Sequence, residues 1–361
     1  MAGRDPVSPR TATMPEAARG AWFQGPDLVT ALREHNGNAE YALPRERKTF
    51  SIGSDPDCDI PISGPYLSAL HCVVERRGNR LRVHDQHSRN GTFFAGRREP
   101  TFDIGAGETF TAASTTFLTM NDEMRQHRPL LADIVGTDAT PSPDDLLACA
   151  VRGTNVLITG EPGCDQDRLA RGLHAVSLRR SLPIIEVAEL PATRAAQREL
   201  IDRAARSTLV LALDARASRI DPTFCSMLLS SSFHVRLIAI AEAAAVATEV
   251  LGIDATGPMQ HVWLRPLASR TGEILYLLDR MFAERGAALR VAELTPANQA
   301  ALQSYAWPEN LAGLRLAADR LEALVREQTL RKAADALAMS KSTLHHWLDR
   351  LRLSLPLTQS T

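Results

Sequence analysis

The sequence lacks the features of secreted, zinc-binding and membrane proteins. Its five cysteines are scattered without a C-x-x-C pair, so we expect neither a disulfide framework nor a zinc site. We expect the protein to occupy a reducing compartment. No apolar run approaches the roughly 20 residues of a membrane helix, and residues 1–20 lack the apolar core of a signal peptide. A formal net charge of −1 restricts any nucleic-acid or membrane binding to a local patch. We therefore expect a cytoplasmic protein with no membrane partner.

The 361 residues exceed one ordinary domain, and their pattern changes along the chain. Residues 28–120 hold short β-branched or aromatic runs, which predict an all-β sandwich with a hairpin turn at Gly78–Asn79. Residues 146–260 alternate apolar runs with helical segments, which predicts an α/β domain with a covered parallel sheet. A small helical subdomain (261–326) and a pair of short helices with a tail (327–361) follow. Residues 1–27 are expected to be a disordered leader and residues 121–145 a linker.

Spaced residues in the β-rich region resemble the forkhead-associated (FHA) domain, which reads phosphothreonine peptides. Gly53 matches the glycine of the family's G-R pair, while Ser68 and His71 form its S-x-x-H. The segment Asn90–Thr92 matches its N-G-T. The resemblance implies that Ser68 donates its hydroxyl to the phosphate, Asn90 binds the peptide backbone and His71 holds the loops together.

Two arginines of the FHA pattern are replaced, by Ser54 and by Ala69. Charge-assisted hydrogen bonds are about twice as strong as neutral ones, so phosphate capture is weakened unless Arg89 or Arg97 compensates. The alternative is a motif that survives only as a scaffold for protein interaction. The candidate phosphopeptide-binding residues are Gly53, Ser54, Ser68, His71, Arg89, Asn90, Gly91 and Thr92.

The stretch TNVLITGEPGCDQDRLARGLH, residues 154–174, has a strand–loop–helix pattern that resembles the AAA+ domain of sigma-54-dependent transcriptional activators. The resemblance continues through VWLRPL and YAWPENL and covers about residues 134–325. A nucleotide loop G-x-x-x-x-G-K-[ST] needs glycines and a lysine at the phosphates. Here Asp165 replaces the second required glycine and Gln166 replaces the lysine. A carboxylate about 4 Å from a phosphate costs about 4 kcal/mol near a surface, so tight ATP binding is not expected.

Other catalytic positions of the AAA+ family are also altered. The family's Asp-Glu pair is Asp214-Ala215, its polar sensor is Ala241-Glu242, and an arginine expected at the γ-phosphate is Ala312. The GAFTGA loop that grips sigma factor is absent. The resemblance therefore implies a pseudo-ATPase with no catalytic residues, metal or cofactor, and weak ATP binding is the alternative. The residues of the degenerate site are Gly160, Gly163, Asp165, Gln166, Asp167 and Asp214.

The segment LRKAADALAMSKSTLHHWLDRLRL, near the C-terminus, resembles the helix-turn-helix of the factor-for-inversion type. Ser340 is expected to cap the second helix, and Leu344, Leu348 and Leu351 fall on its inward face. Residues 326–352 hold six Lys or Arg against three acids, a local excess that favours phosphate contact. The alternative is a plain helical hairpin that packs on a partner. The candidate DNA-binding residues are Lys341, Ser342, Thr343, His345, His346 and Arg350.

These features together predict a bacterial-type, DNA-binding transcriptional regulator with an FHA sensor and a non-hydrolysing AAA+-like body. The expected partners are duplex DNA, a phosphorylated protein or its own phosphorylated leader (at Thr11 or Thr13), and further copies of the chain. An FHA-based adaptor that reads no DNA and a weakly ATP-binding sigma-54-type activator are the alternatives.

Overall fold

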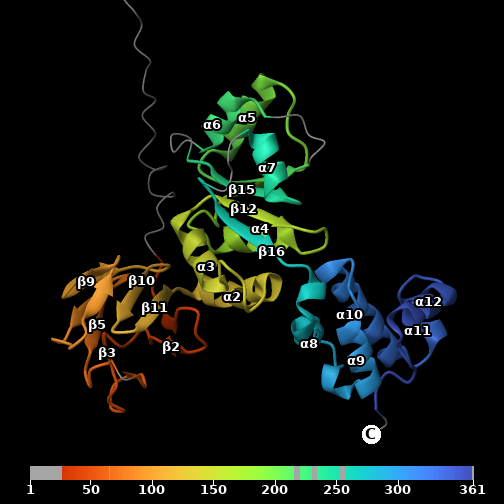
Figure 1. Cartoon of the computed structure of the whole chain (residues 1–361), viewed down its shortest axis with the longest axis horizontal. Coiled ribbons are helices and arrows are strands. Elements are labelled where there is room, and N and C mark those ends of the chain that lie inside the picture. Colours follow the sequence, from red (N-terminus) through yellow and green to blue (C-terminus); the bar gives the residue numbers. More distant parts are fainter. Residues whose placement is uncertain (1–26, 65, 215–219, 230–233, 253–256, 360–361) are drawn as a thin grey trace, which may run out of the picture. The chain divides into compact units, whose positions relative to one another are not determined.

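The computed structural model describes residues 27–64, 66–214, 220–229, 234–252 and 257–359. The chain divides into two compact units, residues 1–122 and 123–361, which are coloured along the sequence in Figure 1. The expected leader lies outside the described residues except for Asp27. Within the described residues, no helix is long and apolar enough to cross a membrane.

The first unit is a β-sandwich, as the sequence predicts. One sheet has the strand order β2-β1-β11-β10-β7-β8 and the other β4-β3-β5-β6-β9. Alternate residues of β3, β5 and β6 are buried between them, which is the period-2 pattern of a strand with one face in a core. The strands are β1 (Ala31–Glu34), β2 (Glu40–Ala42), β3 (Thr49–Gly53), β4 (Ile60–Pro61), β5 (Cys72–Arg77), β6 (Arg80–Asp85), β7 (Thr92–Phe94), β8 (Arg97–Arg98), β9 (Thr101–Ile104), β10 (Thr109–Ala112) and β11 (Thr115–Met120).

The expected hairpin joins β5 to β6. Arg77 pairs with Arg80 across the turn, and Gly78 has a φ of +60°, which glycine adopts without steric cost. The opposite end of the same strand pair starts at Cys72, which pairs with Asp85. Ile52 also pairs with Cys72, so the loops after β3, before β5 and after β6 gather at this end of the sandwich.

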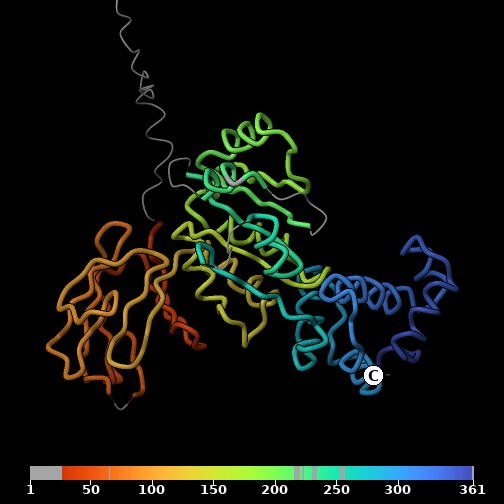
Figure 2. The backbone as a smooth tube through the Cα atoms, turned by 45° about the horizontal axis from the view of Figure 1, so that its top comes forward, coloured from red at the N-terminus to blue at the C-terminus, as the bar shows by residue number. Residues whose placement is uncertain are grey.

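The second unit contains a parallel sheet with the order β13-β14-β15-β12-β16. Its three central strands β14, β15 and β12 are largely apolar and buried, as expected where both faces are covered. Helices alternate with the strands along the chain (Figures 1 and 2). The elements are β12 (Val156–Gly160), α4 (Gln166–Val176), β13 (Ile184–Val187), α5 (Arg194–Ala204), β14 (Thr208–Leu213), α6 (Pro222–Leu229), β15 (Arg236–Ala241), α7 (Ala244–Leu251) and β16 (Gln260–Leu264).

The prediction of a linker at residues 121–145 is wrong. Helix α2 (Asp122–Val135) occupies most of it and buries one apolar face, including Leu131 and Ile134. The Arg270 guanidinium donates to the Ile134 carbonyl at 2.7 Å and so satisfies the C-terminal end of the helix. Helix α3 (Pro143–Arg152) then begins inside the same range. The many charged residues on the outer face of α2 gave the segment its polar composition.

The expected boundary at residues 260 and 261 is also wrong. Strand β16 crosses it and pairs with β12 from Gln260 to Leu264, so it belongs to the sheet. The helical part follows and has the elements η2 (Leu267–Ser269), η3 (Thr271–Glu273), α8 (Ile274–Glu284), η4 (Val291–Glu293), α9 (Pro296–Ser304), α10 (Asn310–Glu327), α11 (Leu330–Ala336) and α12 (Lys341–Leu351).

The C-terminal segment packs back on the start of α9. The Asn298 side chain donates through Nδ2 to the carbonyls of Ser354, at 3.0 Å, and Leu357, at 3.1 Å. The Thr295 amide donates to the Leu357 carbonyl at 2.9 Å, and the Leu357 side chain is only 3% exposed. Residues 353–359 are therefore attached to the helical part rather than free.

Candidate functional site

His71 joins the loops at the end of the sandwich where the loops after β3, before β5 and after β6 gather. Its side chain is fully buried. The Ser68 amide donates to Nδ1 at 3.3 Å, and Nε2 lies 3.1 Å from the Gly91 carbonyl. These two partners require a neutral ring with its proton on Nε2. Burial lowers the pKa of His71, which favours this neutral form.

Ser68 and Asn90 lie at the surface of the same loops. The Ser68 hydroxyl accepts from the Arg89 amide at 3.1 Å, which leaves its own hydrogen available to donate. The exposed Asn90 side chain donates through Nδ2 to the Tyr66 carbonyl at 2.6 Å, so its Oδ1 can accept from a peptide amide. Geometry thus brings the two expected contact residues to one surface.

Asp85 organises the loop that follows β6, and the sequence analysis missed it. It accepts from the hydroxyls of Ser88, at 2.5 Å, and Thr92, at 2.8 Å. The Ser88 hydroxyl in turn accepts from the Gly91 amide at 3.0 Å. Burial raises the pKa of Asp85, but these hydrogen bonds outweigh it and lower the pKa overall. The D-x-x-S spacing just before Asn90 was the available signal.

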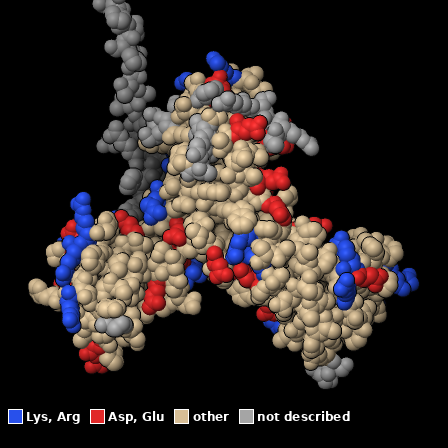
Figure 3. Space-filling view, viewed as in Figure 1, with Lys and Arg blue, Asp and Glu red and all other residues tan. Residues whose placement is uncertain are grey.

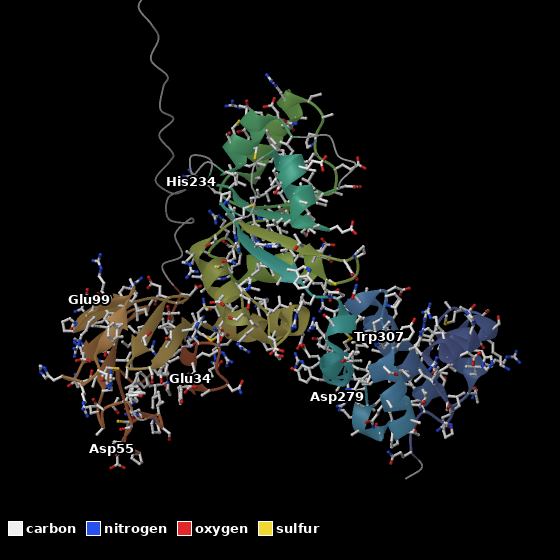
Figure 4. All side chains as sticks on the ribbon, in the orientation of Figure 1. Glu34, Asp55, Glu99, His234, Asp279 and Trp307 are labelled. Atoms are coloured by element: carbon white, nitrogen blue, oxygen red, sulfur yellow. The ribbon has the colours of Figure 1, made fainter. Side chains whose placement is uncertain are left out.

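The replaced arginine position lies beside Ser68. Gly53 is needed for close approach, because a Cβ there would stand 1.9 Å from the Ala69 carbonyl oxygen. The Ser54 amide donates to the Ser68 carbonyl at 2.9 Å, so an arginine at position 54 would reach the surface next to the Ser68 hydroxyl. Exposed Asp55, labelled in Figure 4, follows directly and adds negative charge at this end.

Arg89 and Arg97 are both exposed, so either guanidinium can face solvent. The neighbouring Arg98 is engaged with the fold, since its guanidinium donates to the Ser88 carbonyl at 3.1 Å. Of the two expected cations, Arg89 is the one whose backbone amide donates to the Ser68 hydroxyl.

In the second unit, the loop between β12 and α4, where the sequence predicts a degenerate nucleotide site, has two residues in the left-handed conformation. Gly163 has a φ of +84°, and Asp165 has a φ of +65° at the start of α4. A left-handed conformation is one that glycine adopts freely and aspartate tolerates. Asp165 thus occupies the conformation of the glycine that it replaces.

Gln166 closes this loop on itself. Its Nε2 donates to the carbonyls of Gly160, at 3.0 Å, and Glu161, at 2.8 Å. A lysine at this position would carry a charge to a phosphate, whereas the neutral amide is consumed by the loop. Asp167, on the following turn, is exposed.

The Asp165 carboxylate is paired with arginine. Arg315, from α10, donates to it at 3.1 Å and through a second, shorter bond, and Arg168 donates at 3.2 Å. Only 8% of the Asp165 side chain is exposed. The cavity that these residues line with α2 and α8 is about 20 Å³, which is space for a water molecule.

The other expected catalytic positions lie around this loop. Asp214 and Ala241 stand at the carboxyl ends of β14 and β15, where ligands of parallel sheets bind. Ala312 lies in the first turn of α10, and its amide donates to the Gly163 carbonyl at 3.0 Å. These positions therefore lie at the carboxyl ends of neighbouring strands and at the start of α10, and the degenerate AAA+ site stays a prediction.

The C-terminal helices α11 and α12 form a compact pair against α10. Ser340 caps α12 and accepts from the Thr343 amide at 3.0 Å. Leu344, Leu348 and Leu351 are buried, as expected, and so is Trp347, over whose ring the Arg320 guanidinium lies at 5.1 Å. The candidate contact residues Lys341, Ser342, Thr343, His345, His346 and Arg350 are all exposed.

The exposed surface of α12 is not uniformly basic. His345 lies 3.7 Å from Asp349, one turn further on. Figure 3 shows both signs of charge on the visible face of the C-terminal helices. The candidate DNA-binding residues therefore share one helix surface with Asp349, one of the three acids counted in residues 326–352.

Comparison with known proteins identifies the first unit. The family model of the FHA domain matches residues 50–111, so the chain contains an FHA domain. The FHA domain of the CT664 protein from Chlamydia trachomatis is 28% identical, and its match covers 25% of this chain and 95% of that chain with a TM-score of 0.24. EmbR from Mycobacterium tuberculosis, solved with a low-affinity phosphopeptide, is 21% identical over 26% of this chain and 24% of that chain, with a TM-score of 0.24.

A longer match involves NtrX from Brucella abortus, solved in complex with ATP. It is 18% identical and covers 64% of this chain and 68% of that chain, with a TM-score of 0.40. At these TM-scores the likenesses describe partial similarity of shape and carry nothing about activity. No curated protein sequence matches the chain.

Proposed function

We propose that this chain is a cytoplasmic, DNA-binding transcriptional regulator with an FHA sensor and a non-hydrolysing AAA+-like body. The observation that carries the proposal is the capped α11–α12 pair, which exposes polar and basic side chains on its second helix while burying the opposite face. A second helix presented in this way is the element that a helix-turn-helix places in the major groove. The FHA domain supplies the site for a phosphorylated partner.

DNA binding is tested by fluorescence anisotropy with the full chain and the duplex upstream of its gene. Binding is expected to weaken steeply with salt, because each neutralised phosphate releases counterions. Lys341→Ala should weaken binding to all sequences, whereas Lys48→Ala, which removes an exposed lysine of the first unit, serves as the control. Equal affinity for every duplex, with no effect of Lys341→Ala, would leave the adaptor alternative.

The FHA site is proposed to bind a phosphothreonine peptide of a partner or of the leader. Support comes from the intact hydrogen bonds of His71, Ser68 and Asn90 at one surface. An array of paired phosphorylated and unphosphorylated peptides, including the leader segment around Thr11 and Thr13, tests this. Binding that ignores phosphorylation would support a scaffold for protein interaction instead.

The body is proposed to lack ATP hydrolysis. The supporting observation is the Asp165 carboxylate, which is held by Arg315 and Arg168 where a phosphate would need to lie. Phosphate release measured with and without sigma-54 holoenzyme tests this directly. Clear turnover would favour the sigma-54-type activator and contradict the pseudo-ATPase.

A further inference from the structure

The degenerate loop belongs to a chain of alternating charges that links four helices. Asp165 begins it at the N-terminus of α4. Arg315, from α10, and Arg168, from α4, both donate to the Asp165 carboxylate. With 8% of the Asp165 side chain and 27% of the Arg315 side chain exposed, this ion pair is shielded from solvent, so salt screens it less than a surface pair.

The same chain of charges continues onto α8 and α2. Arg168 lies 3.9 Å from Glu284 of α8. Arg280 lies 3.9 Å from Glu284 and donates to Asp133 of α2 at 3.2 Å. Three acids thus alternate with three arginines, and their formal charges cancel. Since all three arginines have carboxylate partners, the network offers a nucleotide no free cation.

Uncharged contacts, made by the Asn310 side chain and by the backbone, also hold the loop to the start of α10. The Asn310 side chain donates through Nδ2 to the Pro162 carbonyl at 3.0 Å, and its Oδ1 accepts from the Leu267 backbone amide at 2.8 Å. Gly163 packs so closely that a Cβ there would stand 2.3 Å from the Glu309 carbonyl oxygen. The loop, the segment after β16 and α10 therefore meet at one joint.

We propose that the former nucleotide loop is a ligand-free clasp, in which the Asp165 carboxylate takes the place of a phosphate and fixes the helical part to the sheet. On a nucleotide-binding loop of this kind, a bound phosphate would contact the arginines of the helical part. That contact would be lost whenever the nucleotide dissociated. Here the anion is covalently part of the chain, so the clasp is closed in every ligand state. The inference concerns stability within the second unit and does not depend on DNA binding.

Hydrogen exchange of the full chain, followed by mass spectrometry, tests the clasp. Asp165→Asn keeps a residue that tolerates the left-handed backbone, and Arg315→Gln removes the opposite charge. Both should accelerate exchange in peptides covering 160–170 and 310–316 by about 100-fold, because removing one member of a buried pair leaves the other uncompensated. ATP added to the unaltered chain should change nothing in these peptides.

Arg326→Gln is the matched control, because it removes an arginine of the same helix that pairs at the surface with Glu322, at 3.6 Å, and Glu327, at 3.1 Å. Its exchange pattern at residues 160–170 should stay unchanged. If Asp165→Asn unfolds the whole unit, Arg168→Gln removes a half-exposed member of the network and should produce a smaller acceleration in the same peptides.

Two results would overturn the clasp. Unchanged exchange at residues 160–170 in both Asp165→Asn and Arg315→Gln would show that the charges hold nothing. Protection of the same peptides by ATP in the unaltered chain would show that the joint needs a ligand after all. Loss of DNA binding with normal exchange would contradict the proposed regulator and leave the clasp intact.

Discussion

At the scale of single residues, a substitution at Ser54 distinguishes an FHA site that binds phosphopeptides from one that serves only as a scaffold. The Ser54 backbone amide donates to the Ser68 carbonyl, so Ser54→Arg should place a guanidinium beside the hydroxyl that is proposed to donate to the phosphate. We expect phosphopeptide affinity to rise by about tenfold, since a charge-assisted hydrogen bond contributes about 1.5–3 kcal/mol. Asn79→Arg adds the same charge at the opposite hairpin and is the control.

Isothermal titration with a phosphothreonine peptide and its unphosphorylated form measures this effect. An equal gain for both peptides, or an equal gain in Asn79→Arg, would mean that only the general charge of the domain matters. No gain at all would indicate that the site has become a scaffold.

His71 makes the stability of the FHA domain depend on pH. Because burial lowers its pKa in the folded state, its contribution to stability is fully present above the unfolded pKa of about 6.5 and is lost as the pH falls toward the folded pKa. Each pH unit in this window should cost up to about 1.4 kcal/mol. Protonation of Nδ1 would also break its bond with the Ser68 amide.

Hydrogen exchange of peptides around Ser68 and Gly91, compared between pH 7.5 and 5.5 after correction for intrinsic rates, checks this. His71→Gln should lower protection at pH 7.5 and remove most of the pH dependence. The exposed His87 offers the matched control, because His87→Gln should leave the pH dependence unchanged.

At the scale of elements, the N-cap of α12 is the local signal that the sequence shows most directly. Ser340→Ala removes the acceptor for the Thr343 amide and should destabilise the C-terminal helices by about 1 kcal/mol. Ser342→Ala, two residues further on, removes a hydroxyl that accepts from no helix amide in the described structure and should cost less. Urea denaturation followed by Trp347 fluorescence compares the two, and equal losses would contradict the capping role.

The other elements followed from periodicity to different degrees. The alternating strands of the sandwich and the apolar runs of the parallel sheet were predictable, because each repeats a burial pattern over several residues. Helix α2 was not, because its charged outer face made residues 121–145 resemble a linker. Strand β16 was also missed, since five residues carry too little pattern to separate a strand from the start of the helical part.

At the scale of the second unit, the segment after α12 is attached to the start of α9. Asn298→Ala removes the donor to the carbonyls of Ser354 and Leu357 and the acceptor for the Ser354 amide. Leu357→Ala removes a buried side chain and should cost about 2–3 kcal/mol. We expect both to release residues 353–359 to rapid exchange and proteolysis.

Limited proteolysis followed by mass spectrometry locates this release. Leu355→Ala is the control, because Leu355 is 53% exposed and should behave like the unaltered chain. If Leu357→Ala shows the same cleavage pattern as Leu355→Ala, the segment does not secure the helices.

The sequence by itself determined the FHA motif, the glycine-rich loop between β12 and α4 and the capped C-terminal helices, because each depends on residues close together in the chain. Only the tertiary structure showed which side chains bind the Asp165 carboxylate. Asp165 and Arg315 are 150 positions apart, and a single sequence contains no signal for such a pair. The sequence of the loop predicts that phosphate-binding groups are missing, whereas only the tertiary structure shows that Arg315 of α10 reaches Asp165 at the start of α4.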